Sequence, residues 1–89
     1  MIQEKITISN KLGLHARASA KLTKLAGSFA CDVWMTRNER RINAKSIMGV
    51  MMLAAGMGAT VEIETDGVDE REAMDGLLAL INEKFGEGE

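Results

Sequence analysis

The sequence contains one histidine, His15, within the segment Gly13-Leu14-His15-Ala16-Arg17. A glycine-bearing loop precedes it and good helix formers follow, which predicts a helix that begins just after His15. The first N–H groups of a helix lack intrahelical acceptors, and the helix dipole adds partial positive charge there, so anions bind. The same field disfavours imidazolium, and Arg17 adds a guanidinium suited to phosphate oxygens. These groups together are typical of a phosphoryl acceptor.

Other assignments for His15 have less support from the residue pattern. The simplest alternative, an ordinary polar surface residue, stays open. A metal site would need more ligands than one histidine and one cysteine supply, so we expect neither a metal nor a cofactor. No spacing indicates a Ser-His-Asp triad. The segment Gly56-Met57-Gly58 precedes an expected strand instead of following one, which argues against a dinucleotide loop.

Composition limits the class of protein. A chain of 89 residues holds one small domain, expected over residues 1–89, and 46% hydrophobic with 27% charged residues is a globular balance. The longest apolar run, Ile47 to Gly58, is too short and too rich in glycine for a transmembrane helix, and the first residues lack a signal-peptide pattern. A single Cys31 forms no internal disulfide. We therefore expect a cytoplasmic monomer without membrane contact.

Charge is divided unevenly along the chain. Residues 1–45 carry nine Lys and Arg against three acidic residues, a net +6, whereas residues 46–89 carry two against ten, a net −8. This asymmetry indicates a basic face that meets an acidic partner or an anion. With three aromatic residues and no basic run interleaved with Phe or Tyr, nucleic acid is not an expected partner.

Alternation of apolar and polar residues predicts four strands. They are expected over residues 2–8, 32–37, 40–44 and 60–66, with Glu4 the exception to the alternation in the first. Asn38 is expected to supply the positive φ of a tight turn between the second and third strands.

Helical spacing predicts three helices. The first spans residues 16–26 and is ended by Gly27. The second follows the N-cap Ser46, covers residues 47–54, and is closed by Gly56 and Gly58. The third is capped by Asp69, with Glu72 completing a capping box. Its apolar stripe comprises Ala73, Met74, Leu77, Leu78, Ile81 and Phe85.

The resulting element order is β-α-β-β-α-β-α. Strands with one solvated face, and helices gathered on the other, predict an α+β open-faced sandwich. We expect a four-stranded, mostly antiparallel sheet with three helices on one face.

Two blocks of the sequence resemble one known family. Gly13-Leu14-His15-Ala16-Arg17, followed by Ala20, resembles the active-site signature of the HPr family, the histidine phosphocarriers of the bacterial phosphoenolpyruvate-dependent phosphotransferase system. The segment from Asn43 to Met51 resembles that family's regulatory serine signature. The two blocks lie at the family's separation, and length and element order agree over the whole chain. The family usually has proline where this chain has Ala18, so we expect a modest effect on the transfer rate.

The resemblance implies a mechanism and partners. A phosphorylated enzyme I, charged by phosphoenolpyruvate, would transfer its phosphoryl group to His15, which would pass it to an enzyme IIA domain. The family favours Nδ1, although the sequence does not distinguish the two ring nitrogens. The Arg17 side chain and the backbone N–H groups of Ala16 and Arg17 would bind the phosphoryl oxygens. The chain would then be a covalent intermediate and not an enzyme.

Two alternatives to a sugar-transport carrier stay open. One is a regulatory carrier of a nitrogen-linked or incomplete phosphotransferase branch that moves no sugar. The other is a small α+β protein-binding module without covalent chemistry.

Ser46 and the methionines that follow it have structural and functional interpretations. Ser46 is a helix cap on its residue type alone. The family adds phosphorylation of Ser46 by a serine kinase, reversed by a phosphorylase. A methionine stripe is more often core, but a short helix that is apolar nearly all round cannot be wholly buried, so we expect exposure led by Met48. The expected docking face comprises Lys21, Lys24, Lys45, Ile47, Met48, Met51 and Met52.

Overall fold

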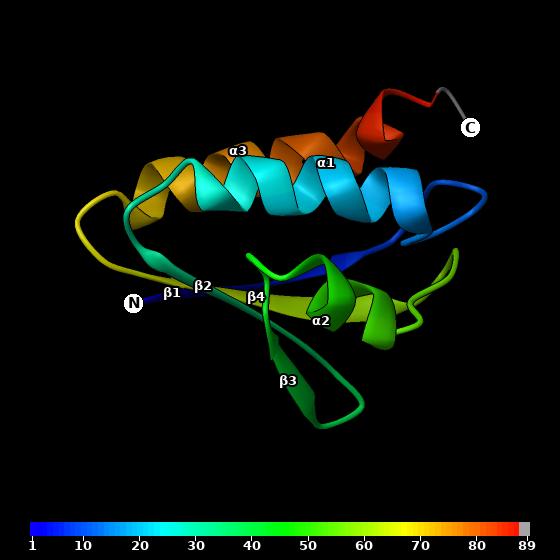
Figure 1. The fold of residues 1–89 in the computed structure, drawn as a ribbon, viewed down its shortest axis with the longest axis horizontal. Helices are drawn as coiled ribbons and strands as arrows, with labels where there is room; N and C mark the ends of the chain where they lie inside the picture. Colours follow the sequence, from blue (N-terminus) through cyan, green and yellow to red (C-terminus); the bar gives the residue numbers. More distant parts are fainter. Residues whose placement is uncertain (88–89) are drawn as a thin grey trace.

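The computed structural model describes residues 1–87, so the expected domain over residues 1–89 has its last two residues outside the described part. In chain order the elements are β1 (Ile2–Thr7), α1 (Ala16–Gly27), β2 (Asp32–Arg37), β3 (Arg40–Asn43), α2 (Ile47–Met52), β4 (Thr60–Asp66), α3 (Glu70–Asn82) and the short 3₁₀ turn η1 (Lys84–Gly86) (Figure 1).

The four strands form one sheet in the order β1-β4-β2-β3, and every neighbouring pair is antiparallel. Helices α1 and α3 run side by side along one face, and α2 contacts both α1 and β3 (Figure 1). Helix α1 therefore lies between α3 and α2. The predicted α+β open-faced sandwich and its element order are confirmed.

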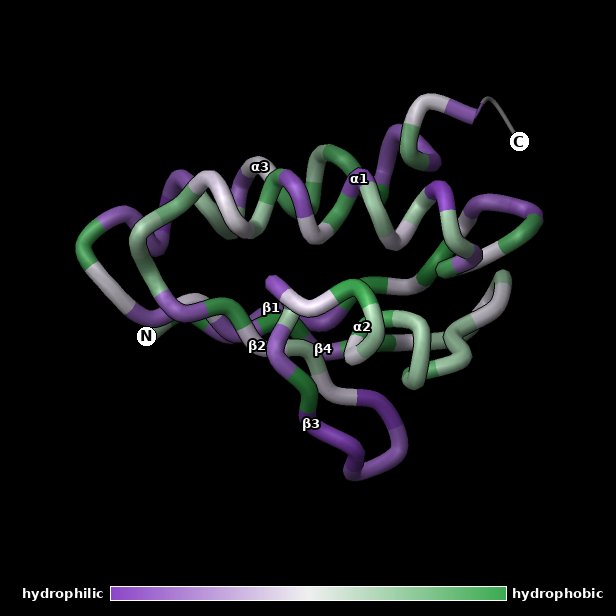
Figure 2. The backbone as a smooth tube through the Cα atoms, in the orientation of Figure 1, coloured by the Kyte–Doolittle hydropathy of each residue, from purple (hydrophilic) through white to green (hydrophobic). Residues whose placement is uncertain are grey.

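The core lies between the sheet and the helices. Val33, Met35, Val61 and Ile63 alternate toward it from the two central strands, and each is at most 1% exposed. The apolar stripes of α1 and α3 cover these side chains, whereas the tip of the β2–β3 hairpin is hydrophilic (Figure 2). That hairpin turns through Asn38 (φ 51) and Glu39 (φ 68), which confirms the positive φ expected at Asn38.

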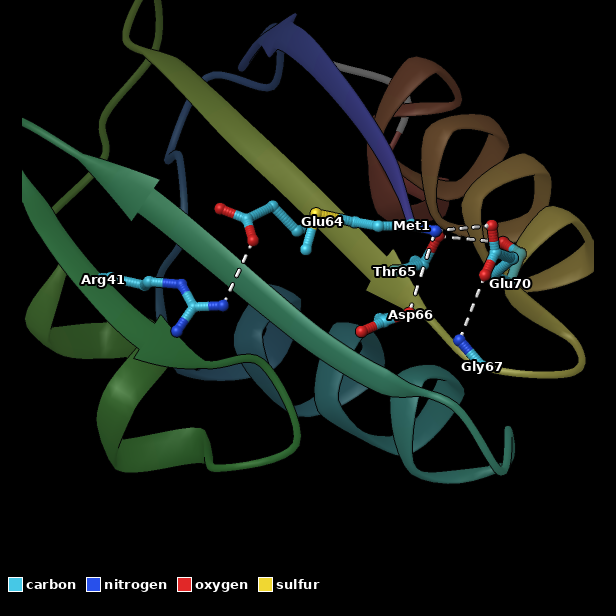
Figure 3. Close-up of polar contacts among 7 residues, drawn as sticks. All are labelled: Met1, Arg41, Glu64, Thr65, Asp66, Gly67 and Glu70. Atoms are coloured by element: carbon cyan, nitrogen blue, oxygen red, sulfur yellow. Dashed lines mark hydrogen bonds and ion pairs between the residues drawn. The ribbon is translucent and has the colours of Figure 1, made fainter.

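The outer face of the sheet carries one buried acidic residue that alternation alone places in solvent. Glu64 is 7% exposed, and its Oε2 accepts a hydrogen bond from Nη2 of Arg41 at 3.1 Å (Figure 3). The guanidinium of Arg41 also lies 4.2 Å from the centroid of the Trp34 ring. Pairing with Arg41 therefore permits the burial of this carboxylate.

Helix α2 begins at the predicted residue and ends two residues earlier than predicted. Oγ of Ser46 accepts a hydrogen bond from N–H of Gly49 at 3.2 Å, so the N-cap is confirmed. The helix stops at Met52, and Ala54 turns the chain with φ 50. The expected closure by Gly56 and Gly58 is therefore wrong, because the left-handed turn already occurs at Ala54.

The predicted capping box at α3 is also wrong. The Asp69 carboxylate makes no cap to its own helix and instead accepts hydrogen bonds from N–H of Ala30 and Cys31, both at 2.8 Å. These two hydrogen bonds lower the pKa of Asp69, and the one from Ala30 has the larger effect. Glu70, not Glu72, reaches back, and its Oε1 accepts from N–H of Gly67 at 3.1 Å (Figure 3). Asp69 thus joins α3 to the segment before β2.

Glu70 also fastens the edge strand β1. The Met1 ammonium lies 3.1 Å from Oε2 of Glu70 and 3.7 Å from Oδ1 of Asp66 (Figure 3). Hydroxyl Oγ1 of Thr65 donates to the backbone carbonyl of Glu70 at 2.9 Å. The start of β1, the end of β4 and the start of α3 therefore form one polar junction.

The C-terminal end departs most from the prediction. Phe85 was expected on the apolar stripe of the last helix, but α3 ends at Asn82. Phe85 lies in η1 with φ 55, and its side chain is 1% exposed. Lys84 (φ 55) and Gly86 (φ 76) share the left-handed backbone. The turn delivers Phe85 to the core and leads the chain back toward α1. Within the described residues, no helix has the length and apolar character needed to cross a membrane.

Candidate functional site

The loop between β1 and α1 is held against the segment that follows α2. Gly13 has φ +64, and a Cβ built there would lie 2.5 Å from the carbonyl oxygen of Ala55, so only glycine fits. Leu14 N–H donates to that same oxygen at 2.9 Å. From inside the loop, Nδ2 of the fully buried Asn10 donates to the carbonyl of Gly13 at 2.8 Å. The peptide group between Gly13 and Leu14, just before His15, is therefore held by hydrogen bonds at both its N–H and its carbonyl oxygen.

His15 is the N-cap of α1, with extended backbone angles (φ −77, ψ −179). Its carbonyl accepts the first helical bond, from N–H of Ser19 at 2.8 Å, while its side chain makes no cap. Ala18, at the position of the family's proline, is fully buried in the first turn. The ring stays free for other contacts, and its side chain is 27% exposed. It opens into a depression that is also lined by Lys11, Leu12, Ala16, Arg17, Gly86 and Glu87.

Glu87 contacts the ring of His15 directly. Its Oε2 lies 2.5 Å from Nε2 of His15, and its Oε1 accepts from Nδ2 of Asn10 at 3.0 Å. Burial acts to raise the pKa of Glu87, but the hydrogen bonds from Asn10 and His15 outweigh it and lower that pKa below 4.5. Because an ionised carboxylate only accepts, Nε2 is assigned the proton, and in the neutral ring Nδ1 keeps a lone pair.

Two basic residues, Lys11 and Arg17, line the depression into which the ring opens. Ala16 and Arg17 form the first turn of α1, where N–H groups have no acceptor within the helix. Within residues 1–87, the Arg17 guanidinium has no recorded protein partner, and Arg17 and Lys11 are both exposed. A nucleophilic nitrogen beside unpaired N–H donors and a guanidinium can accept a phosphoryl group and stabilise its oxygens. The structure thus brings together His15, Ala16 and Arg17 from the sequence prediction.

The predicted docking residues divide into two groups. On α2, Ile47, Met48, Met51 and Met52 are between 40% and 69% exposed, and Met48 is the most exposed of them. The lysines differ, because Nζ of Lys21 donates to the carbonyl of Phe85 at 2.6 Å and Nζ of Lys45 to that of Phe29 at 2.9 Å. Lys24 is exposed without a recorded partner in residues 1–87. Ser46 does not line the depression around His15.

Sequence reasoning missed Asn10 and Glu87. Both lie outside the two recognised blocks, and Glu87 is 72 residues from the ring that it contacts. Asn10 is a polar residue in an expected loop, so the sequence gives no reason to expect it to be buried. Nothing in the sequence pairs Asn10 with Glu87. In the part of the chain that the structure describes, no three His, Cys, Asp or Glu side chains gather as metal ligands.

Comparisons with known proteins agree with this geometry. A family model described as "PTS HPr component phosphorylation site" matches residues 2–83. "Phosphocarrier protein HPr" of Cupriavidus necator is 71% identical over 89 residues, with both chains covered in full.

Solved structures give the same answer. The crystal structure of HPr-C-His from Thermoanaerobacter tengcongensis matches with a TM-score of 0.95 at 42% identity, covering 98% of both chains. An HPr dimer from the same organism matches with a TM-score of 0.79 at 42% identity, covering 98% of this chain and 100% of that one. The chain therefore belongs to the HPr family, the phosphocarrier proteins of the phosphotransferase system.

Proposed function

We propose that His15 accepts a phosphoryl group from phosphorylated enzyme I and passes it to enzyme IIA domains. The observation that carries this proposal is the geometry of the one histidine. It caps α1 beside Arg17, its Nε2 faces the Glu87 carboxylate, and Nδ1 remains available as the nucleophile. The open depression suits a reaction in which both partners are proteins and no small substrate needs a deep pocket.

The transfer needs little covalent chemistry from this chain. The Nδ1 lone pair forms a bond to phosphorus while the bond between phosphorus and the donor breaks, and that electron pair leaves with the donor. Transfer onward reverses the roles, because a nucleophile of the acceptor attacks phosphorus and the electron pair returns to Nδ1. Arg17 and the N–H groups of Ala16 and Arg17 stabilise the phosphoryl oxygens in both directions. The protein is therefore a covalent intermediate and not an enzyme with its own turnover.

The exposed face of α2 is the proposed contact for both protein partners. Its members Met48, Met51 and Met52 are flexible apolar side chains, which suit a surface that must fit more than one partner. Helix α2 packs beside α1, so a protein bound there also reaches the start of α1. We propose further that a serine kinase phosphorylates Ser46 and that a phosphorylase removes the phosphate. Ser46 is exposed, so both enzymes can reach it.

We propose a monomer in the cytoplasm as the working form. The depression and the α2 face are both open in a single chain. The single buried Cys31 fits a reducing compartment. Because one HPr relative forms a dimer, light scattering after size-exclusion chromatography should test this point directly. A dimeric mass at micromolar concentration would contradict it.

The decisive experiment mixes the chain with enzyme I and phosphoenolpyruvate and detects acid-labile phosphate by mass spectrometry. We expect one phosphate on the wild type and none on His15→Ala, while Ser46→Ala is labelled normally. No phosphate on the wild type would favour a binding module without covalent chemistry. Undiminished labelling of His15→Ala would place the phosphate on another residue. Transfer from the labelled protein to IIA domains of the sugar and the nitrogen-linked branches then separates the two carrier functions.

A further inference from the structure

The turn after α3 adopts an unfavourable backbone that its surroundings hold in place. Lys84, Phe85 and Gly86 all have positive φ, which is strained for the first two because they carry side chains. The ring of Phe85 is buried in the core, and Lys21 of α1 donates to the Phe85 carbonyl at 2.6 Å. The turn is thus fixed from inside the core and from α1, although it lies near the end of the chain.

This turn places Glu87 on the ring of His15. Asn10 then ties the carboxylate to the loop that positions the ring, because Nδ2 donates both to Glu87 Oε1 and to the Gly13 carbonyl. Both of these partners are acceptors, so the Asn10 amide can face them only with its nitrogen. Glu87 thus joins the turn after α3 to one nitrogen of the imidazole, and Asn10 joins the same carboxylate to the loop that precedes His15.

We propose that Glu87 is the positioning residue of His15, a role that rests on the proposed phosphocarrier function. Its carboxylate holds the proton on Nε2, so the neutral ring presents the Nδ1 lone pair to phosphorus. When the Nδ1–phosphorus bond forms, Nε2 keeps its proton and the ring becomes positively charged. The carboxylate stabilises that charge as it does the imidazolium of a catalytic histidine. On onward transfer the electron pair returns to Nδ1, and the charge disappears.

The positions of the charged groups around the ring support a positioning role for Glu87 and a phosphoryl-binding role for the basic residues. A carboxylate beside Nδ1 would repel an incoming phosphoryl group, but Glu87 contacts the opposite nitrogen. Lys11 and Arg17 line the depression itself, and Lys21 lies near Glu87 through its contact with the turn. Glu87 also lines the depression, but both of its carboxylate oxygens are engaged, with Nε2 of His15 and Nδ2 of Asn10, which leaves Lys11 and Arg17 to meet the phosphoryl oxygens.

Two substitutions at Glu87 separate the hydrogen bond from the charge. Glu87→Ala removes both, and Glu87→Gln keeps the shape and one acceptor oxygen but loses the charge and the second acceptor. The first measurement, on unphosphorylated protein, is the ¹⁵N chemical shift of the two ring nitrogens, which reports the tautomer. The second is the rate of phosphoryl transfer from enzyme I. Glu83→Gln is the matched control, because Glu83 is an exposed glutamate next to the same turn and does not line the depression.

We expect wild type and Glu83→Gln to show the neutral ring protonated at Nε2. In Glu87→Ala both tautomers should appear and transfer should slow by about tenfold, the scale of losing a carboxylate that orients a functional histidine. Glu87→Gln should keep more of the Nε2–H tautomer and still transfer more slowly than wild type. A wild-type tautomer and rate in Glu87→Ala would overturn the proposal while leaving His15 as the acceptor. Loss of labelling in the wild type would instead reject the phosphocarrier function, with the tautomer result still readable.

Discussion

Arg17 and Lys11 both bring positive charge to the depression around His15, but they differ in what they can do there. Arg17 lies in the first turn of α1, so its backbone is fixed relative to the ring, and its planar guanidinium can bind two phosphoryl oxygens at once. Lys11 lies in the preceding loop and offers a single ammonium. We infer that Arg17 carries the larger share of transition-state stabilisation.

Arg17→Ala should reduce phosphoryl transfer by about 10²-fold, because one preorganised donor to a charged transition state is worth roughly that factor. Arg17→Lys should recover only part of this loss, since an ammonium cannot reproduce the bidentate contact. The measurement is the single-turnover rate from phosphorylated enzyme I. Arg71→Ala, on the exposed side of α3, is the matched control and should transfer normally. Equal rates for Arg17→Ala and Arg71→Ala would show that the guanidinium does not take part.

At the scale of elements, α2 depends strongly on its cap. It has six residues, too few for intrinsic helix propensity to sustain it. Ser46 satisfies the N–H of Gly49, while Val50 and the following Leu53 anchor the segment in the core. The apolar residues left outside this anchor form the proposed docking face. The cap therefore supports both the helix and the surface that the helix presents.

Ser46→Ala should lower the free energy of unfolding by about 1 kcal/mol, the usual effect of losing an N-cap side chain. Ser46→Asp should retain most of the stability, because its carboxylate accepts the same N–H bond and interacts favourably with the helix dipole. Urea denaturation measures both. Ser9→Ala is the matched control, because the exposed Ser9 hydroxyl makes no hydrogen bond within residues 1–87. This variant should change the free energy of unfolding little. A Ser46→Ala variant as stable as Ser9→Ala would show that the cap is dispensable.

Asp69 makes the junction between α3 and the segment before β2 sensitive to acid. Its pKa lies below the ordinary value of 3.8 in the folded protein, so its stabilising contribution is complete above about pH 4 and disappears as pH falls through the lowered value. Asp69→Asn should therefore be less stable than wild type at pH 7, and the difference should shrink toward pH 3. Thermal unfolding at several pH values measures this. Asp75→Asn, an exposed carboxylate of the same helix, should show little difference at pH 7. A constant gap between wild type and Asp69→Asn would contradict the assignment.

The contrast between these elements explains which features the sequence could predict. His15 at the start of α1 and Ser46 at the start of α2 depend on residues within a few positions of each, so local patterns were sufficient. Asp69 has the residue type of an N-cap, but a competing pair of N–H groups at Ala30 and Cys31 takes its carboxylate. Phe85 continues the helical spacing, yet the core accepts it only after the backbone turns left-handed. The Glu87 contact depends on that turn, so helical periodicity could not predict it.

At the scale of the whole molecule, the uneven charge of the sequence becomes a division between helices. Helix α1 contains three basic residues, Arg17, Lys21 and Lys24, and no acidic one, whereas acidic residues outnumber basic ones on α3. Because α1 lies between α3 and α2, the basic helix borders the apolar docking face. Two of the predicted rim lysines are engaged with backbone carbonyls, at Phe85 and Phe29. Lys24 is thus the rim lysine best placed to steer an approaching partner.

Lys24→Glu should slow association with enzyme I by about threefold at low salt, because a basic surface steers an acidic partner over the Debye length. At about 0.01 M salt that length is about 30 Å, and at about 1 M it is about 3 Å, so the effect should vanish at high salt. The measurement is the second-order rate of phosphoryl transfer at both salt concentrations.

Lys5→Glu is the matched control, since it makes the same charge change on the other side of the sheet. Lys5 pairs in register with Glu62, which lies between the buried Val61 and Ile63 and therefore faces away from the helices. An equal slowing by Lys5→Glu would mean that net charge, and not the position of Lys24, sets the rate. If Lys24→Glu slowed transfer equally at both salt concentrations, the loss would instead come from a direct contact in the complex. Only a salt-dependent loss confined to Lys24 identifies the exposed part of α1 around Lys24 as a surface that partners approach.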